Sequence, residues 1–458
     1  MHQVASQAGS LSIERVVFFQ PRTFAEDNYQ TTTGHEQQWV PWAAFFLAPL
    51  ARNMGLKVNL IDARVEPTKW VERISALGPT DLLAVSVMTG HAIRDSVRAS
   101  KIARNCGSKI IWGGPHASLF PTETLEQAPV DAVISGFGYI PFTHLLMSVR
   151  EDKWPQQNEI GLLVKSTNTL DNHHTPSKYV QVPLGTLPRP YLDLVEDWAP
   201  YLNPDVAIAS RTINLITSEG CTRSCTYCSE PRVSASTWLT RDLSHMVAVA
   251  KDLCARSGAN GVKLHDPNFF HDMSRAQQFS RLFAEKISLP WAATMHPSDL
   301  DHASGKYLDQ LASDGLVRVL VGLESPDPEI VRLAGKQYDP TRIPELAKKL
   351  AKARIRGMFT FIVGWPDADP AHYSRTIECA FGIRDIWEEH QAKIHFLEPW
   401  PGTPIYRLLS RRGFCFPQTL NEWANIDYYQ AKYAMIHDPE RLHEIRNANR
   451  RLSPYVNA

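Results

Sequence analysis

Three cysteines stand close together near the middle of the chain: Cys221, Cys225 and Cys228, in the segment SEGCTRSCTYC. The run INLIT before them is typical of a strand, so the cysteines are expected in the loop that follows it. Thiolates hold iron–sulfur clusters, and a cubane cluster normally takes four of them. Three cysteines with no fourth nearby would leave one iron open to an external ligand. The spacing therefore predicts a 4Fe–4S cluster wrapped by one loop, which Tyr227 shields from solvent.

A zinc site is the alternative for the same cysteines. A structural zinc ion needs a fourth ligand close by. The nearest downstream histidine is His245, and no second pair of cysteines with this spacing is present. The sequence thus favours the cluster. The remaining cysteines are scattered and are interpreted as small core or surface residues: Cys106, Cys254, Cys379 and Cys415.

Composition limits the class of protein that carries this loop. The chain has 458 residues, 48 basic and 48 acidic, so its formal net charge is zero and gives no reason to expect a nucleic-acid or membrane-surface partner. A hydrophobic fraction of 43% is that of a folded protein. No long apolar run and no signal-peptide pattern is found, and the cysteines are few and odd in number, so a cytoplasmic location is expected.

Elements before the cysteine loop alternate short apolar runs with helical patterns. The expected strands are residues 15–20, 58–62, 81–87, 109–112 and 131–135, and the expected helices are residues 39–53, 67–77, 93–105, 123–127 and 140–150. This order predicts an α/β fold with a doubly wound parallel, Rossmann-like domain over residues 1–150, whose ligands bind beyond the carboxyl ends of the strands. Residues 151–208 are interpreted as a connector with a candidate hairpin at 161–165 and 179–182.

The same alternation resumes around and after the cysteine loop. The expected strands are residues 213–217, 261–265, 291–295, 316–322, 358–364 and 393–397, each separated from the next by a helical segment. Six strands suit a partial (β/α)6 barrel over residues 209–402 better than a closed eight-stranded one. Residues 403–458 are predicted to form a helical C-terminal cap.

Residue by residue, the cysteine loop resembles that of the radical S-adenosylmethionine (SAM) superfamily. The resemblance implies that SAM chelates the open iron and that an electron from the cluster releases a 5′-deoxyadenosyl radical. Residues at the carboxyl ends of barrel strands, together with Tyr227, would then contact the cofactor. Glu324 in VGLES would meet its ribose or amino group, Gly364 in FIVGWP would let the backbone approach its adenosine, and Asp266 in LHDPN would face the barrel mouth.

Glycine-rich loops follow three strands of the predicted N-terminal domain. The dinucleotide fingerprint GxGxxG is absent after the first strand, and the acidic cluster and lysine of a receiver domain are not visible. The segments WGGPHASLFP and VDAVISGFG instead resemble loops of the cobalamin-binding domain of cobalamin-dependent radical SAM enzymes, the class B radical SAM methyltransferases. The resemblance implies cobalamin contacts at Ser86, Thr89, Gly90, Gly113, Gly114, His116, Gly136 and Gly138. The glycines would let the backbone lie against the corrin, and ordinary tight turns are the alternative.

Two features depart from the usual pattern of that domain. The second loop reads Gly136-Phe-Gly-Tyr139, without the usual glutamates. No D-x-H-x-x-G segment supplies a histidine ligand to cobalt, which fits a family that mostly binds cobalamin without one. Arg64, after the predicted second strand, would lie below the corrin and disfavour a lower ligand; the alternative is a surface salt bridge.

The combined resemblance implies an enzyme that methylates an unactivated carbon, or less often phosphorus, of a small molecule. Methylcobalamin would be the immediate methyl donor, SAM would recharge it, and a second SAM would make the substrate radical. An external flavodoxin- or ferredoxin-type protein would supply electrons. The alternative is a family member that catalyses a ring closure, rearrangement or oxidation without methyl transfer. A non-catalytic sensor or electron carrier is disfavoured because no basic patch or partner-binding module is present.

Polar and aromatic residues near the predicted barrel mouth are candidates for positioning the substrate. They are His265, Asn268, Phe269, His296, Glu398 and Trp400, with Tyr428, Tyr429 and Tyr433 of the C-terminal cap expected to line the same cavity. The sequence does not choose among peptides, amino acids and natural-product intermediates as substrate.

Overall fold

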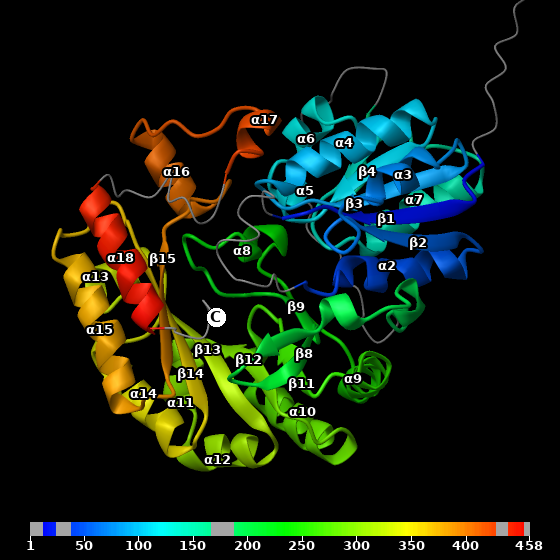
Figure 1. Cartoon of the computed structure of the whole chain (residues 1–458). Helices are drawn as coiled ribbons and strands as arrows, with labels where there is room; N and C mark the ends of the chain where they lie inside the picture. The colour runs from blue at the N-terminus through cyan, green and yellow to red at the C-terminus, as the bar shows by residue number, and fades with distance from the viewer. Residues whose placement is uncertain (1–11, 24–37, 166–186, 427–437, 453–458) are drawn as a thin grey trace, which may run out of the picture.

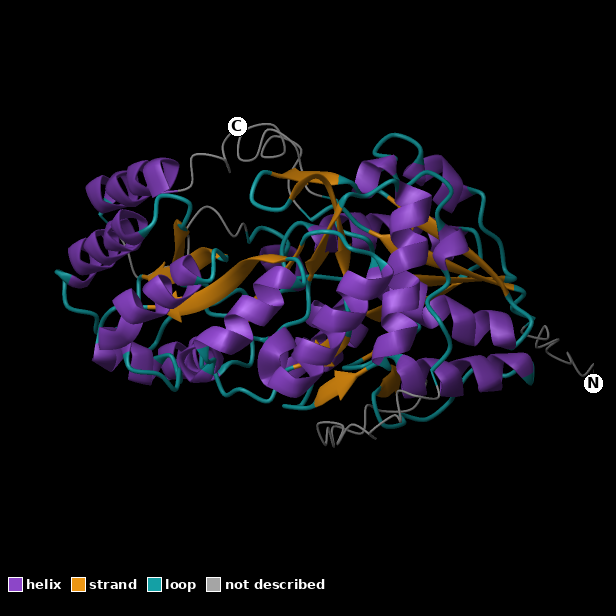
Figure 2. Ribbon diagram, turned by 90° about the horizontal axis from the view of Figure 1, so that it is seen from below, coloured by secondary structure: helices purple, strands orange, loops and turns teal. Residues whose placement is uncertain are grey.

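Two large sheets form the framework of the protein (Figure 1). A computed structural model describes residues 12–23, 38–165, 187–426 and 438–452. In Figure 2 the strands of the two sheets form two orange groups toward opposite ends of the molecule, each with purple helices beside it. No helix within the described ranges combines the length and apolar character needed to cross a membrane.

The N-terminal sheet has the strand order β2-β1-β3-β4-β5-β6. Its strands are β1 (Arg15–Gln20), β2 (Lys57–Asp62), β3 (Asp81–Ser86), β4 (Lys109–Gly113), β5 (Ala132–Ile134) and β6 (Leu162–Val164). β1 to β5 run parallel, as predicted, and β6 pairs antiparallel with β5. One arm of the predicted hairpin therefore extends this sheet, and the other arm, residues 179–182, lies outside the described residues.

Helices cover both faces of this sheet: α2 (Trp42–Asn53), α3 (Trp70–Ser75), α4 (Ala92–Asn105), α5 (Pro115–Leu119), α6 (Pro121–Gln127) and α7 (Tyr139–Arg150). Successive residues of β1 point to opposite faces of the sheet, and each packs against a helix on its own face. The ring of Phe18 lies 6.0 Å from that of Phe142 in α7, whereas the ring of Phe19 lies 5.3 Å from that of Trp70 in α3. A strand that is apolar on both faces must be covered on both. The doubly wound fold is confirmed.

The second sheet has the order β15-β14-β13-β12-β11-β8-β7. Its parallel strands are β8 (Ala209–Leu215), β11 (Gly261–Leu264), β12 (Trp291–Met295), β13 (Leu316–Glu324), β14 (Arg356–Val363) and β15 (Gln391–Phe396). The six predicted strands and the partial barrel are confirmed. A short strand that was not predicted, β7 (Asn203–Asp205), pairs antiparallel with β8.

Helices cover the outer face of the half-barrel: α9 (Leu243–Ser257), α10 (Met273–Lys286), α11 (Pro297–His302), α12 (Gly305–Ser313), α13 (Pro328–Leu333), α14 (Ile343–Lys352) and α15 (His372–Ile386). Side chains alternate between the two faces of each strand, and the large buried ones point toward the helices. In β12, Trp291 is fully buried and packs with Phe279 and Phe283 of α10. Burial of such large rings supplies much of the stability of this layer.

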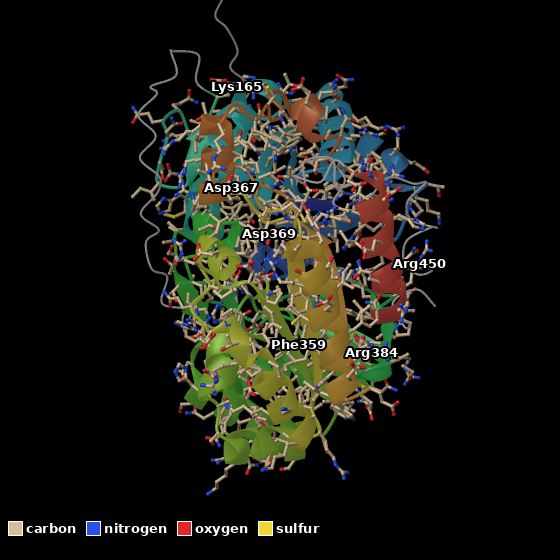
Figure 3. All side chains as sticks on the ribbon, turned by 90° about the vertical axis from the view of Figure 1, so that its left-hand side faces the viewer. Lys165, Phe359, Asp367, Asp369, Arg384 and Arg450 are labelled. Atoms are coloured by element: carbon tan, nitrogen blue, oxygen red, sulfur yellow. The ribbon has the colours of Figure 1, made fainter. Side chains whose placement is uncertain are left out.

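The C-terminal helices divide between the two parts of the molecule. α18 (Pro439–Leu452) packs against β15 and α15, and Figure 3 shows it beside α15, with Arg450 on one helix and Arg384 on the other. α16 (Pro404–Arg411) and α17 (Leu420–Trp423) instead lie near the N-terminal sheet. There the Leu420 amide donates to Gln127 at 2.7 Å, and the Trp423 ring lies 5.1 Å from Phe120. The helices predicted for the C-terminus are present, and they pack on two different parts of the molecule.

Candidate active site

A pair of short strands frames the cysteine loop. β9 (Ser218–Gly220) and β10 (Trp238–Thr240) pair antiparallel, so the two ends of the loop between them lie side by side. The loop between them contains the three cysteines and α8 (Glu230–Val233), which Figure 1 places between the two large sheets. All three cysteines are free thiols, and burial raises the pKa of each, that of Cys228 to about 12. Such thiols become thiolates readily only when a cation takes up their charge, as the iron of a cluster does.

The positions of these thiols bear on the zinc alternative. Within the described residues, no three histidine, cysteine or carboxylate side chains converge closely enough to hold one metal ion. A zinc ion needs its ligands around a single point. The ligands of a cubane bind different irons and stand farther apart. The assignment of the three cysteines as cluster ligands stays a prediction.

Two sets of hydrogen bonds fix the cysteine loop on the barrel. At its start, the Asp266 carboxylate accepts from the backbone amide and the hydroxyl of Thr217, at 2.8 and 2.7 Å, and from the Ser218 hydroxyl at 2.5 Å. Within it, the Thr226 amide donates to the Ala334 carbonyl at 2.9 Å. Asp266 is buried and holds the strand end that precedes the cysteines. Its predicted contact with a cofactor stays a prediction.

Gly335 lies directly beneath the cysteine loop. Its φ is +70°, and a Cβ there would stand 2.7 Å from the Ser224 carbonyl oxygen. Gly335→Ala is therefore expected to displace the loop and to weaken cluster binding about 10-fold, in addition to about 1 kcal/mol lost through backbone strain. Iron content per chain and thermal unfolding measure the two effects.

Gly258 provides the control for this substitution. Its φ is +69°, and a Cβ there would meet nothing within 4 Å. Gly258→Ala is expected to show the strain alone and to keep the full iron content. Equal iron in the two variants would contradict the role given to Gly335.

A buried ion pair lies beside the middle cysteine. Glu324, at the end of β13, accepts a hydrogen bond from the Tyr227 hydroxyl at 2.6 Å and pairs with the Lys336 ammonium at 3.1 Å. Burial alone would lower the pKa of Lys336, but the Glu324 carboxylate and the Cys225 side chain raise it. Glu324 adopts a φ of +68°, which directs its side chain away from the regular strand pattern. The structure thus brings the predicted residues Tyr227 and Glu324 together and adds Lys336.

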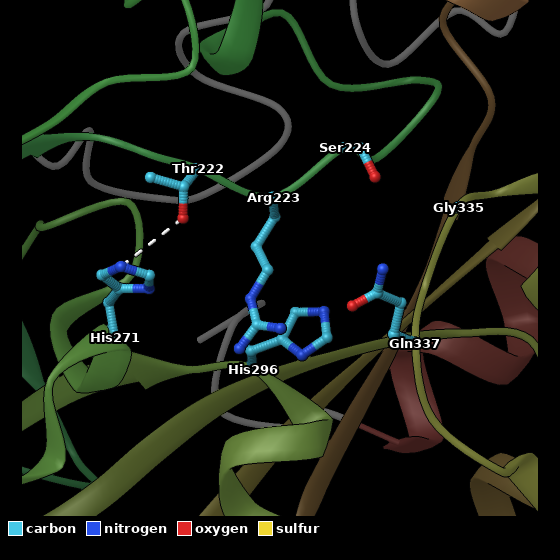
Figure 4. Close-up of a pocket in the computed structure, with 7 residues that line it drawn as sticks. All are labelled: Thr222, Arg223, Ser224, His271, His296, Gly335 and Gln337. Carbon is cyan, nitrogen blue, oxygen red and sulfur yellow. Dashed lines mark hydrogen bonds between the residues drawn. The ribbon is translucent and has the colours of Figure 1, made fainter.

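A pocket of about 320 Å³ lies against the cysteine loop, and Figure 4 shows the side chains that line it. Its walls are Thr222, Arg223, Ser224, His271, His296, Gly335 and Gln337. Arg223 pairs with Asp299 at 2.5 Å, and Asn268 donates to the same carboxylate at 3.4 Å. The Nε of Arg223 and the Oδ1 of Asn268 are buried without a hydrogen-bond partner among the described residues. Unsatisfied polar atoms of this kind fit a polar ligand held next to the loop.

The residues predicted to line the mouth have different outcomes. His296 lines the pocket of Figure 4, and Asn268 lies beside its Arg223–Asp299 pair. Phe269 was expected at the mouth, and this is wrong, because the short helical turn after β11 directs it into a buried aromatic cluster, 5.8 Å from Trp291. The positioning roles of Glu398 and Trp400 stay predictions. Tyr428, Tyr429 and Tyr433 lie outside the described residues.

The predicted cobalamin loops meet at the carboxyl edge of the N-terminal sheet. The Val87 amide donates to the Gly113 carbonyl at 2.9 Å, which joins the loops after β3 and β4. Thr89 and His116 share a hydrogen bond of 3.0 Å, and the Gly136 amide donates to Ser118 at 2.8 Å, which adds the loop after β5. Ser86 and Gly90 flank the same edge, and Gly90 and Gly136 both have positive φ.

Two of the glycines have a physical reason that the sequence did not reveal. A Cβ on Gly114, whose φ is +89°, would stand 2.8 Å from the Val87 amide nitrogen. A Cβ on Gly138 would stand 3.3 Å from Leu47. Contacts between protein segments therefore require or favour glycine at both positions, whether or not a corrin also lies there.

His116 is buried between these loops, and burial lowers its pKa from 6.5 to about 4. Between these values the unfolded chain binds a proton that the folded chain does not, so His116 makes stability fall as the pH is lowered. The loss amounts to about 2 kcal/mol between pH 7 and pH 5. His116→Asn is expected to remove that much of the pH dependence, measured by urea unfolding at both pH values. An unchanged slope would mean that His116 is accessible to solvent.

Arg64 is held on the protein side of its loop. Its guanidinium binds both carboxylate oxygens of Asp62, at 2.9 and 2.6 Å, and donates to the Trp39 carbonyl at 2.8 Å. Only 6% of its side chain is exposed, so the surface salt bridge expected as the alternative is wrong and the pair is buried. The Tyr201 hydroxyl also donates to Asp62, at 2.9 Å. A place for Arg64 below a corrin stays a prediction.

The loop that departs from the usual pattern joins the two domains. Phe137 packs on Gly220, the residue before Cys221, where a Cβ would stand 3.1 Å from the phenyl ring. The Tyr139 hydroxyl donates to Glu219, and Arg241 donates to the same hydroxyl at 2.5 Å. The aromatic residues that replace the usual glutamates therefore dock the N-terminal domain onto the strands that frame the cysteine loop.

The structure also brings in site residues that sequence reasoning missed. Lys336 and Gly335 reach the cysteine loop through a turn whose glycine was the only local signal. Trp39 lies between the domains, with its ring centroid 3.4 Å from that of His265. It was placed in a predicted helix, but α2 begins at Trp42.

Comparisons with known proteins agree with this organisation. Residues 215–380 match the radical SAM superfamily, and residues 34–146 match the B12 binding domain. An uncharacterized methyltransferase of Pyrococcus horikoshii is 23% identical over 84% of this chain and 82% of its own. The cytidylyl-2-hydroxyethylphosphonate methyltransferase of Streptomyces wedmorensis is 25% identical over 67% of this chain and 62% of its own. The fold is also similar to that of the radical SAM methyltransferase TsrM from Kitasatospora setae, whose structure contains tryptophan and a SAM analogue. The TM-score is 0.70 at 16% sequence identity, and the match covers 87% of this chain and 76% of that one.

Proposed function

We propose that this protein methylates a small molecule. The chain combines a B12-binding domain with a radical SAM domain and therefore belongs to the cobalamin-dependent radical SAM enzymes. The observation that carries the proposal is the direct docking of the Phe137–Tyr139 loop on the strands framing the cysteine loop. This contact sets the carboxyl edge of the N-terminal sheet against the cysteine loop (Figure 1). The curated relatives and the similar structure are named methyltransferases, which supports the same activity.

Each part of the site has a role in this proposal. When bound, cobalamin supplies a transferable methyl group, and SAM with the cluster supplies methyl groups and radical chemistry. Cys221, Cys225 and Cys228 would hold the cluster, and Glu324 with Lys336 would present fixed charges beside it. The β3, β4 and β5 loops would hold the corrin.

The preferred acceptor is an unactivated carbon. Phosphorus is the second choice, because one relative is named a phosphonate methyltransferase. A family member that closes or rearranges a ring without methyl transfer is the alternative function, since the same two domains would serve it.

Formation of S-adenosylhomocysteine (SAH) distinguishes these functions. Iron-replete enzyme with cobalamin, SAM and a strong reductant is expected to form SAH in an amount that matches the bound cobalamin before any substrate is added. Enzyme without cobalamin is the control and is expected to form none. 5′-Deoxyadenosine without SAH would support the non-methylating alternative, and neither product would overturn the proposal.

A further inference from the structure

The inner face of the half-barrel is accessible to solvent, unlike the face that packs on the helices. Alternate residues of the strands show the contrast. Val319, Phe359 and Ile394 point toward the helices and are buried. Leu320, Met358, Thr360 and Lys393 on the other face are partly exposed, and His395 is exposed. Within the described residues, several side chains of the concave face are therefore partly accessible to solvent.

Four cations lie on this inner face: Lys263 in β11, Arg318 in β13, Arg356 in β14 and Lys393 in β15. The strand register places Lys263 and Arg318 on either side of Ala292, about 10 Å apart between their backbones. The intervening side chain on this face is only a methyl group, so no large side chain separates the two cations.

Two of the four cations pair with carboxylates, and one of these, Arg356, binds Glu389 at 2.5 Å. Arg318 binds both oxygens of Asp205, at 2.9 and 2.8 Å, across the base of the half-barrel. Lys263 contacts the ring face of Trp39 at 5.2 Å. Neither Lys263 nor Lys393 has a carboxylate partner in the part of the chain that the structure describes.

Holding two such ammonium groups inside a protein costs free energy. Burial, and then the charge of Arg318, lowers the pKa of Lys263 to about 8; the Asp205 carboxylate opposes this shift and Lys393 adds to it. Burial also lowers the pKa of Lys393. An anion bound between them would offset this cost, whereas a neutral or cationic ligand would not.

An aromatic wall stands beside the two lysines. Trp39 is 40% exposed and packs edge-on against His265. The next residue, Val40, donates its amide to Asn214 on β8 at 2.8 Å, which fixes the segment over the barrel. A carbon skeleton next to the lysines would contact this wall.

We infer that the substrate carries an oxyanionic group, a carboxylate or a phosphate or phosphonate, that binds between Lys263 and Lys393 while its carbon skeleton lies against Trp39 and His265. The inference rests on the proposed function, because it names the substrate class of that same site. It places the anionic end of the substrate inside the half-barrel and leaves the other end free to face the cysteine loop.

Oxyanion binding can be measured without turnover. Inorganic phosphate and succinate are titrated into cobalamin-loaded enzyme at constant ionic strength set with chloride, and thermal unfolding is followed. At least one oxyanion is expected to raise the melting temperature in a saturable manner. Lys263→Gln and Lys393→Gln are each expected to weaken the apparent affinity about 10-fold or more, because each removes a charge-assisted hydrogen bond. Lys263→Arg, which keeps the charge, is expected to retain binding.

Lys251→Met provides the matched control, because Lys251 is exposed on α9 of the same domain and is expected to bind as the wild type does. Stabilisation by phosphate alone would assign a phosphate or phosphonate substrate, and stabilisation by succinate alone would assign a carboxylate. No stabilisation, or equal loss in Lys251→Met, would overturn the inference. Loss of the effect at saturating SAM would also overturn it, since the lysines would then hold the SAM carboxylate. SAH formation is measured separately, so failure of oxyanion binding and failure of methyl transfer remain distinguishable.

Discussion

Replacing Cys225 with serine is expected to abolish cluster binding and, with it, all cleavage of SAM. The loop offers three thiols and no spare ligand, and a serine hydroxyl does not ionise near neutral pH to replace one. Loss of a direct ligand exceeds the roughly 100-fold effect of losing a supporting residue. Iron and sulfide content per chain and the yield of 5′-deoxyadenosine measure the result.

A cysteine outside the loop separates this effect from a general loss of thiols. Cys415 is exposed and lies near α16, far from the cysteine loop in sequence. Cys415→Ser is expected to leave iron content and product yield at the wild-type level. Normal iron in Cys225→Ser would mean that another residue ligates the cluster and that the predicted triad is incomplete.

Lys336→Met is expected to give the largest loss of stability, about 3–5 kcal/mol. The substitution leaves the Glu324 carboxylate without its ion-pair partner in a buried site, where only 8% of the lysine and 6% of the glutamate side chain are exposed. The hydrogen bond from Tyr227 would remain but would not neutralise the charge. Chemical unfolding of the wild type and the variant measures the difference.

The double variant Glu324→Gln with Lys336→Met is the test of this explanation. It removes the stranded charge, so it is expected to be more stable than Lys336→Met alone by about 1–3 kcal/mol. If the two variants are equally unstable, lost packing around the lysine stem accounts for the effect and the ion pair does not.

The sequence predicted the sheets well because their strands are continuous apolar runs. β1 and β12 have the predicted ends, and the other predicted strands differ by a few residues. Short strands such as β7, β9 and β10 were missed, because three residues carry no measurable periodicity. The turn after β11 misled the prediction for Phe269, since position after a strand does not fix the direction of a side chain.

The cysteine loop was predictable because its ligands are neighbours in sequence. Lys336, Trp39 and the Arg318–Asp205 pair were not, because each acts through a contact between distant segments. Arg318 and Asp205 are 113 residues apart, and no local pattern couples them. The sequence also did not reveal why residue 114 is glycine, because the side chain that a larger residue would carry there would collide with a neighbouring loop.

The path of the C-terminal segment has a consequence for how the molecule comes apart. After β15 the chain crosses to the N-terminal domain with α16 and α17 and then returns to the barrel as α18. One continuous apolar cluster runs from Trp70 through Trp423 to Ile362, and so includes both domains. Neither domain can separate without exposing this surface and pulling on a chain anchored at both ends. The two domains are therefore expected to unfold together in one cooperative transition rather than in two separate transitions.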